Sequence, residues 1–180
     1  MKAYRFDASK KLEGAYGAQI GLTLRAEVAP TPGPGQVLVR LKANALNFVD
    51  LVCLMGAFPV DGRVPLMDGA GIVEAIGPGV ARWKIGDRVL ANPNLNWLAG
   101  EPEPSTAGVV LGITAEGVLA ELAVLPETGL VAIPDSISFE AAASLPCAGL
   151  SAWSSLSGGP TRRGVRPGDT ILTQGTGGVS

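Results

Sequence analysis

The residue type most informative about chemistry is one that the sequence lacks, because none of its 180 residues is histidine. Histidine is the commonest general base and the commonest metal ligand in proteins. The two cysteines, Cys53 and Cys147, are far apart and form no Cys-x-x-Cys pair, so neither a disulfide framework nor a zinc ribbon is indicated. Any catalysis must therefore proceed without histidine, and both cysteines are expected to be free thiols.

The C-terminal residues form the pattern that comes nearest to a cofactor site. A β-rich run at residues 170–174 leads into a glycine-rich segment whose members are Gly175, Gly177, Gly178 and Val179. In a Rossmann βαβ unit such glycines permit a tight turn and let backbone N–H groups approach a pyrophosphate at the start of the next helix. Taken alone, the segment fits a flexible tail as well as it fits a cofactor loop, because the sequence stops before that helix.

Short strands joined by tight turns are predicted for most of the chain, which contains 25 glycines and 14 prolines. In residues 37–42, apolar Val39 and Leu41 alternate with Arg40 and Lys42, the period of a half-buried strand. Further strands are expected at residues 71–76, 87–91, 118–124 and 130–133. Residues 92–111 contain three prolines without a clear period and are expected to form a long loop.

Two short helices are predicted after the strands. Ser138 is a good N-cap for a helix that begins near Phe139, and Pro146 is expected to end or kink it. Residues 149–156 predict a second short helix. These signals divide the chain into a β domain at 1–135, a helical connection at 136–165 and the start of another domain at 166–180.

The charge distribution limits the partners of the chain. Fourteen basic and sixteen acidic residues give a net charge of −2, with no basic block, so nucleic acid is not an expected partner. The longest apolar runs are too short to span a membrane, and the N-terminus carries charge where a secretory signal would be apolar. A cytoplasmic protein that acts on a small-molecule substrate is therefore expected.

Seven segments in a fixed order carry a family resemblance. They are Pro32–Arg40, Ala45–Leu51, Asp68–Val73, Gly77–Val80, Gly86–Val89, Ala142–Trp153 and Pro167–Asp169. This series resembles the medium-chain dehydrogenase/reductase superfamily and, within it, the quinone oxidoreductase-like members that lack zinc. The resemblance implies a mainly β (α+β) fold: a GroES-like, partly open β-barrel, then short helices and the first strand of a Rossmann domain that binds NADP or NAD.

Zinc is not expected in this chain. The positions that hold the catalytic metal in zinc-dependent members of the superfamily match Asn47, Met67 (followed by Asp68) and Cys147. Of these three, Cys147 alone is a ready zinc ligand, because an amide ligates poorly and a thioether suits other metals. Cys147 is accordingly expected to be a small apolar residue of the interior.

The resemblance also indicates candidate site residues. Asn47 could hydrogen-bond a substrate carbonyl or the nicotinamide ribose, although a loop-capping asparagine is the alternative. Asp50 could orient Asn47 or a water molecule, or it could cap the next turn. Ser151 matches a hydroxyl that contacts nicotinamide in relatives, but serines in short helices often bond back to the backbone.

Residues with weaker claims complete the candidate site. An apolar substrate pocket could use Phe48, Met55, Phe58 and Trp97, which could equally be ordinary core residues. Tyr16 is a possible proton donor in an N-terminal loop, Leu12–Ile20, that is longer than the family pattern requires. Ser180 replaces the third glycine of the Rossmann fingerprint, which departs from the pattern for cofactor binding.

Three hypotheses follow from the sequence. In the first, the chain is a fragment of a zinc-independent, NAD(P)H-dependent oxidoreductase that reduces quinones or α,β-unsaturated carbonyls and is inactive alone. In the second, it is a stand-alone GroES-like module that binds a ligand or partner without catalysis. In the third, an unpaired strand at residues 170–174 is disordered or makes the chain a homodimer.

Overall fold

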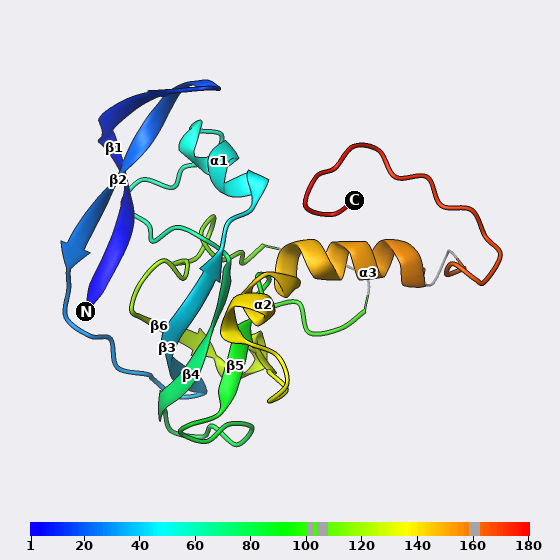
Figure 1. Ribbon diagram of the computed structural model, residues 1–180. Coiled ribbons are helices and arrows are strands. Elements are labelled where there is room, and N and C mark those ends of the chain that lie inside the picture. Colours follow the sequence, from blue (N-terminus) through cyan, green and yellow to red (C-terminus); the bar gives the residue numbers. More distant parts are fainter. Residues whose placement is uncertain (101–102, 104–107, 159–162) are drawn as a thin grey trace.

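A five-stranded antiparallel sheet is the centre of the molecule in the computed structural model, which describes residues 1–100, 103, 108–158 and 163–180 (Figure 1). The sheet has the order β6-β3-β4-β5-β7. Its strands are β3 (Gln36–Ala45), β4 (Asp68–Ile76), β5 (Arg88–Ala91), β6 (Leu122–Pro126) and β7 (Leu130–Ala132). The mainly β character expected from the sequence is confirmed.

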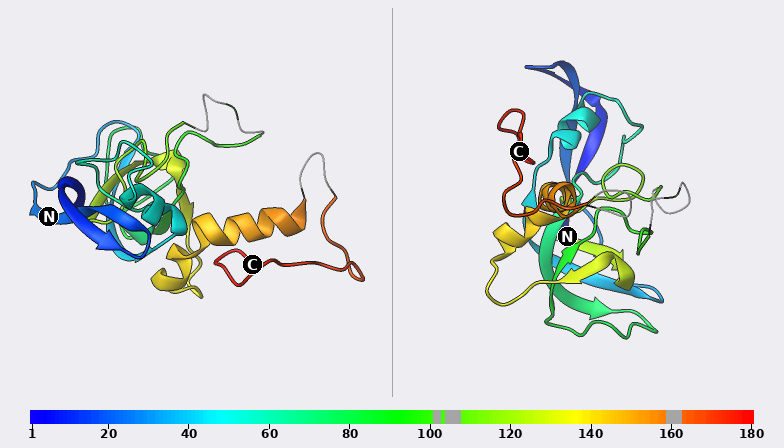
Figure 2. Two further views of the ribbon diagram at one scale, coloured as in Figure 1. Left: turned by 90° about the horizontal axis from the view of Figure 1, so that it is seen from above. Right: turned by 90° about the vertical axis from the view of Figure 1, so that its right-hand side faces the viewer.

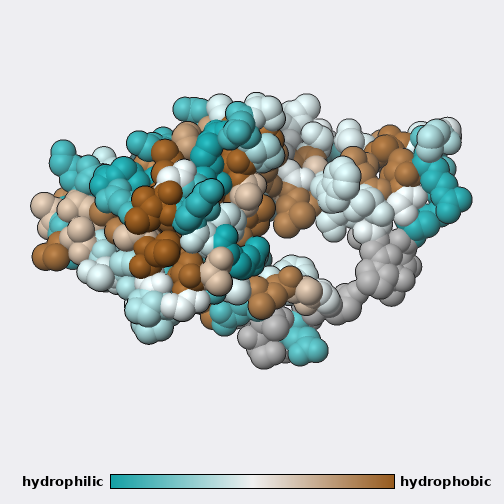
Figure 3. All heavy atoms as spheres, turned by 90° about the horizontal axis from the view of Figure 1, so that it is seen from below, coloured by the Kyte–Doolittle hydropathy of each residue, from teal (hydrophilic) through white to brown (hydrophobic). Residues whose placement is uncertain are grey.

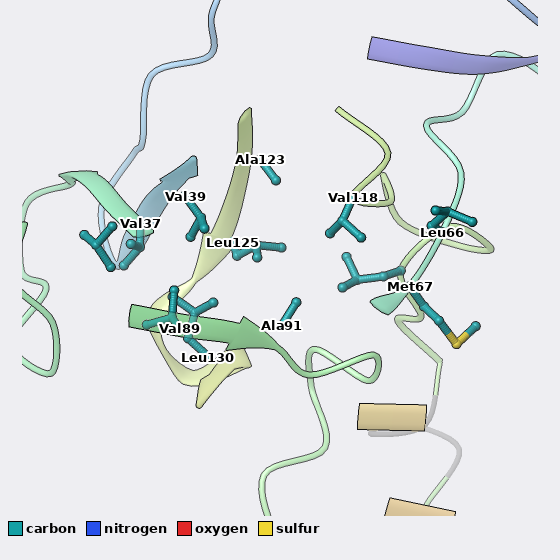
Figure 4. Close-up of a cluster of buried hydrophobic side chains, with 12 residues drawn as sticks. Val37, Val39, Leu66, Met67, Val89, Ala91, Val118, Ala123, Leu125 and Leu130 are labelled. Carbon is teal, nitrogen blue, oxygen red and sulfur yellow. The ribbon is translucent and has the colours of Figure 1, made fainter. Parts of the chain in front are cut away.

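The main core lies against β3, whose buried residues Val37 and Val39 pack with side chains of the other strands. Figure 4 shows these side chains converging with Val89, Leu125 and Leu130 from β5, β6 and β7. Burial of such side chains removes apolar surface from water and is the main force that stabilises the sheet. The predicted alternation is confirmed from Val39 to Lys42, where Arg40 and Lys42 are exposed, whereas Leu38 is buried like its two neighbours.

The N-terminal segment differs from its prediction. Residues Leu12–Ile20 do not form a loop, because β1 (Lys2–Gly14) and β2 (Gly17–Ala26) pair as a long antiparallel hairpin. The two-residue connection is followed by Gly17, whose φ of 88° suits glycine. A register shift between Asp7 and Lys11 divides the hairpin into an open end, where Lys2 pairs with Ala26, and a tip next to the turn. The glycines in this segment therefore mark the turn between two strands, and not a long loop.

Two strand predictions were wrong: one strand begins later than predicted, and the other does not form. Within residues 118–124, the strand β6 begins only at Leu122, because Val118 instead donates its N–H to the Leu66 carbonyl at 2.9 Å. Residues 170–174 form no strand and are exposed to solvent. A Rossmann strand needs parallel neighbours on its edges, and the described part of the chain places none beside these residues.

The two helices predicted after the strands are present, and the structure adds two short helical segments that were not predicted, α1 (Phe48–Leu54) and η1 (Glu127–Gly129). Helix α1 follows β3, η1 is a short turn before β7, and α2 (Phe139–Ala143) begins where Ser138 caps it. The Ser138 Oγ accepts a hydrogen bond from the Ala141 N–H at 3.2 Å. As predicted, α2 ends before Pro146, which lies in the first turn of the wider π-helical segment η2 (Leu145–Gly149).

Helix α3 (Leu150–Ser157) continues directly from η2 and projects from the β domain as an arm (Figure 2). The aligned apolar residues predicted for this helix are exposed: Leu150, Trp153 and Leu156 are 58%, 69% and 43% accessible. Figure 3 shows apolar atoms both on the β domain and along the projecting arm. Among the residues that the structure describes, no helix is long and apolar enough to cross a membrane.

Candidate functional site

A cleft of about 760 Å³ lies where α1, the segment after β5 and the η2–α3 helices meet. Its size falls within the range of pockets that bind cofactors and other small molecules. The described residues that line it are Val49, Met67, Asn92, Pro93, Asn94, Trp97, Leu98, Ala99, Gly100, Val110, Pro146, Cys147, Leu150, Ser151 and Ser154. The cleft is thus largely apolar, with amide and hydroxyl side chains at a few points.

Asp68 is a buried carboxylate behind the cleft wall, and its side chain joins two parts of the chain. Its Oδ2 accepts a hydrogen bond from Asn47 Nδ2 at 2.9 Å and another from the Cys147 backbone N–H at 3.3 Å. Its Oδ1 has no hydrogen-bond partner, although the residue is only 1% exposed. Burial, with a smaller contribution from the nearby Asp50 charge, raises the pKa of Asp68.

Asn47 and Asp50, the two predicted catalytic residues, lie together at the start of α1. The Asp50 carboxylate accepts the Asn47 backbone N–H at 2.7 Å, the contact of a residue that caps a helix. Burial raises the pKa of Asp50. Both residues line a smaller cavity of about 190 Å³ behind α1 and are absent from the wall of the larger cleft.

Cys147 and Ser151 lie one helical turn apart in the cleft wall. Cys147 is half-buried, and burial is the main reason that the pKa of its thiol is raised, so the neutral form is favoured. The Ser151 hydroxyl donates to the Cys147 carbonyl at 2.7 Å, the backbone contact that was one of its two expected roles. Its oxygen remains able to accept a further hydrogen bond.

The glycine-rich segment folds back toward these helices. Residues Gly175 to Ser180 form an exposed turn in which the Ser180 N–H donates to the Gly177 carbonyl at 3.2 Å. A Cβ added at Gly178 would lie 4.0 Å from the Ala148 Cβ. Figure 1 shows this end of the chain on one side of α3, and the approach of Gly178 to Ala148 brings the segment close to η2 even though no strand precedes it.

Only one of the four residues predicted to line an apolar substrate pocket lies in the wall of the cleft. Trp97 lines the cleft, whereas Phe48, Met55 and Phe58 are not among the described residues of its wall. Phe48 is exposed at the start of α1 and makes an edge-to-face contact with Tyr16 at the tip of the β1-β2 hairpin. The two rings have their centroids 6.3 Å apart.

Three polar residues of the cleft wall, Asn92, Asn94 and Ser154, were not singled out from the sequence. The Asn92 Oδ1 accepts the Asn94 N–H at 3.2 Å, which leaves its Nδ2 as the donor end of the amide. An Asn-Pro-Asn run directly after a predicted strand was the available signal, because the end of a strand is a frequent place for site residues.

A family model described as the alcohol dehydrogenase GroES-like domain matches residues 33–135. The chain belongs to this family. Its residues correspond to the N-terminal part of medium-chain dehydrogenases/reductases, so the resemblance inferred from the seven segments is confirmed.

Named relatives of the alcohol dehydrogenase GroES-like family include different kinds of oxidoreductase. A zinc-type alcohol dehydrogenase-like protein of Schizosaccharomyces pombe is 42% identical over 86% of this chain and 45% of its own length. The crystal structure of an NAD-dependent alcohol dehydrogenase has a TM-score of 0.69 and 36% identity, covering 87% of this chain and 46% of that one. A quinone oxidoreductase of Pseudomonas syringae has a TM-score of 0.64 and 33% identity, covering 92% and 43%. The chain thus spans about half the length of these relatives.

The residues at the metal positions of zinc-dependent family members do not fit a catalytic zinc. Asn47 uses its Nδ2 to donate to Asp68, Met67 offers a thioether, and the Cys147 thiol favours its protonated form. Zinc instead prefers thiolate, imidazole and carboxylate in a tetrahedral set. Within the described ranges, no group of three or more histidine, cysteine or acidic residues is placed to hold a metal ion.

Proposed function

We propose that this chain forms the substrate-side wall of a zinc-independent, NAD(P)H-dependent oxidoreductase that reduces quinones or α,β-unsaturated carbonyl compounds. The observation that carries the proposal is the hydrogen-bonded arrangement of Asn47, Asp68 and Cys147, residues that the family resemblance matches to or next to the metal positions of zinc-dependent members. Together with the Met67 thioether, the Asn47 amide and the Cys147 thiol are a poor ligand set for a zinc ion that would help to form an alkoxide from an alcohol. The arrangement instead suits reactions in which hydrogen-bond donors are enough to stabilise the negative charge that develops on the substrate.

Reduction of a conjugated carbonyl needs only modest stabilisation of charge. When bound, a reduced nicotinamide would supply hydride to a carbon conjugated with the carbonyl, and negative charge would then develop on the carbonyl oxygen. In the cleft, the Asn92 Nδ2 and the Ser154 hydroxyl are donors that can hold this oxygen. Water then supplies the proton that completes the reduced product.

The walls of the cleft also suit the substrate class. Val49, Met67 and Val110 offer apolar surface on one side, and Trp97 offers an aromatic face. Flat, weakly polar rings such as quinones gain binding free energy when they leave water for such a surface. Apolar walls exclude water as well, which strengthens the hydrogen bonds made to the reduced oxygen.

The nicotinamide end of the cofactor fits the cleft next to η2 and α3. Ser151 would contact the nicotinamide part, and the backbone N–H groups of Gly175, Gly177, Gly178 and Val179 would approach the pyrophosphate. The turn that these residues form lies close to Ala148 in the same wall. NADP and NAD both remain candidates, because their discrimination rests on residues after the second Rossmann strand.

The test is an assay of the full-length protein that contains this chain, with NADPH and NADH against a panel of quinones, enones and simple alcohols. We expect quinone or enone reduction that survives treatment with a metal chelator. A chelator-sensitive oxidation of simple alcohols would overturn the proposal. The isolated 180-residue chain is expected to be inactive, because it spans about half the length of its relatives.

An internal variant pair sharpens the assay. Ser154→Ala removes one proposed donor from the cleft, and we expect it to lower kcat for enones about tenfold. The matched control, Ser157→Ala, removes a hydroxyl that belongs to the same helix but is outside the described cleft wall. Equal rates for the two variants would exclude Ser154 as an oxygen-binding donor and leave that role to the amide side chains.

A further inference from the structure

The small cavity behind α1 is separate from the cleft. It has a volume of about 190 Å³ and shares no described lining residue with the larger space. Its wall is made by the hairpin, the α1 region and two loops, through Phe6, Leu22, Leu46, Asn47, Asp50, Leu51, Leu54, Pro65, Leu66 and Leu119. Eight of these ten residues are apolar, so the cavity has the chemistry of a hydrophobic site.

The backbone at Leu66 keeps the two spaces apart. Leu66 is the one residue other than glycine with a positive φ (69°) in the described part of the chain, a conformation that is costly for a branched side chain. Its side chain lines the cavity, whereas that of the next residue, Met67, lines the cleft. Figure 4 shows the two side chains projecting in different directions from the same segment.

Neighbouring residues hold Leu66 in this conformation. Its carbonyl accepts the Val118 N–H at 2.9 Å. Two glycines pack against it so closely that an added Cβ would lie 3.0 Å from the Leu66 nitrogen at Gly112 and 2.3 Å from its carbonyl oxygen at Gly117. The surrounding chain therefore imposes a strained backbone at the point that forms the cavity wall.

The polar groups at one end of the cavity are already engaged. Asn47 donates its Nδ2 to Asp68, and the Asp50 Oδ2 accepts the Asn47 N–H. An occupant therefore gains little from polar groups and much from leaving water. An apolar cavity of about 150 Å³ in another protein stays dry and binds benzene, so 190 Å³ is enough for a ring that carries a small substituent.

We propose that this cavity is a binding site for a small apolar molecule, a single aromatic or aliphatic ring of about six to eight carbon atoms. The proposal does not rest on the proposed function, although Asn47 lines this cavity and also bonds to Asp68 behind the cleft. Its occupant lies against Leu22 of β2 and Leu51 and Leu54 of α1, and so fills the space between the hairpin and the helix.

The test uses the 180-residue chain with methyl-labelled leucine and valine, titrated with toluene and followed by NMR. We expect saturable shifts of the Leu22, Leu51, Leu54 and Leu119 methyl groups and nuclear Overhauser contacts from the toluene ring to them. Leu54→Phe fills the cavity and should weaken toluene binding about tenfold or more. Val110→Phe fills the cleft instead and should leave the affinity unchanged.

Each other outcome overturns the proposal. Shifts confined to residues of the cleft, or lost in Val110→Phe and kept in Leu54→Phe, would place the ligand in the cleft. Shifts that never saturate would show partition onto exposed apolar surface. If Leu54→Phe does not fold, the Overhauser contacts in the unsubstituted chain test the proposal, because they report directly whether the toluene ring lies in the cavity. Their absence from the Leu22, Leu51, Leu54 and Leu119 methyl groups would overturn it.

Discussion

Asp68 is the residue whose environment departs most from that of an ordinary carboxylate. It is 1% exposed, one of its oxygens has no partner, and the other accepts both Asn47 and Cys147. Asp68→Ala would leave both donors unpaired, and we expect a loss of about 1–3 kcal/mol in the free energy of unfolding. Urea titration measures this loss. The exposed Asp135, substituted in the same way, is the control and should change stability little.

The raised pKa of Asp68 also predicts how stability depends on pH. Its folded-state pKa lies above the ordinary value of 3.8, so its contribution is fully present below that pH and is lost as the pH rises through the folded-state pKa. Asp68→Asn cannot ionise. The stability of the unsubstituted chain relative to Asp68→Asn should therefore fall as the pH rises from about 4 through the folded-state pKa. A constant difference across that range would contradict the assigned environment.

At the residue scale, the sequence indicated which residues lie together better than it indicated how they bond to one another. Asn47, Asp50, Asp68 and Cys147 are close in space, as the family resemblance implied. Hydrogen-bond direction could not be predicted, because it depends on how α1 and η2 approach β4. That approach makes Asp68 the acceptor of two donors and turns Asp50 toward the backbone.

Among the elements, the stability of α2 depends on Ser138, the N-cap residue that directly precedes the helix. The Ser138 hydroxyl accepts the Ala141 N–H and satisfies one of the free donors at the helix start. Ser138→Ala should lower the free energy of unfolding by about 1 kcal/mol, whereas Ser136→Ala, at an exposed position just before it, should have little effect. Thermal unfolding of the two variants would compare them. Equal midpoints would show that this bond contributes nothing.

The close contact between β3 and β4 depends on Gly71, which has no side chain. A Cβ added at Gly71 would lie 2.2 Å from the Arg40 carbonyl oxygen, next to a register shift in the pairing of the two strands. Gly71→Ala must therefore push the strands apart, and we expect a cost of at least about 1–3 kcal/mol. At Gly177 the same substitution meets nothing within 4 Å and should be neutral. Chemical denaturation of both variants measures the difference.

Element predictions succeeded where the signal was local and failed where it depended on partners. The period-2 pattern from Val39 to Lys42 and the cap at Ser138 are local, and the structure agrees with both. Residues 170–174 have a strand composition but no described neighbour to pair with. Leu12–Ile20 shows the reverse case, because pairing between its two halves created a hairpin that composition alone did not indicate.

For the whole molecule, the C-terminal tail contributes little to the fold. Residues 165–180 are exposed throughout and contribute no side chain to the described core clusters. Deleting Arg166–Ser180 should leave the thermal midpoint of the β domain within about 2 °C of its original value. Light scattering should likewise show an unchanged oligomeric state. A change of state on deletion would revive strand pairing through residues 170–174 as the basis of a homodimer.

The register shift between Asp7 and Lys11 divides the hairpin into two parts that open differently. Before the shift, β1 is tied to the rest of the protein, since Tyr4 and Phe6 donate their N–H groups to Leu119 and Arg63. Beyond it, residues 11–20 pair only with one another in the described sheet. Amide protons at the tip should accordingly exchange with deuterium by local opening, well before those of β3, whose exchange requires the five-stranded sheet to unfold.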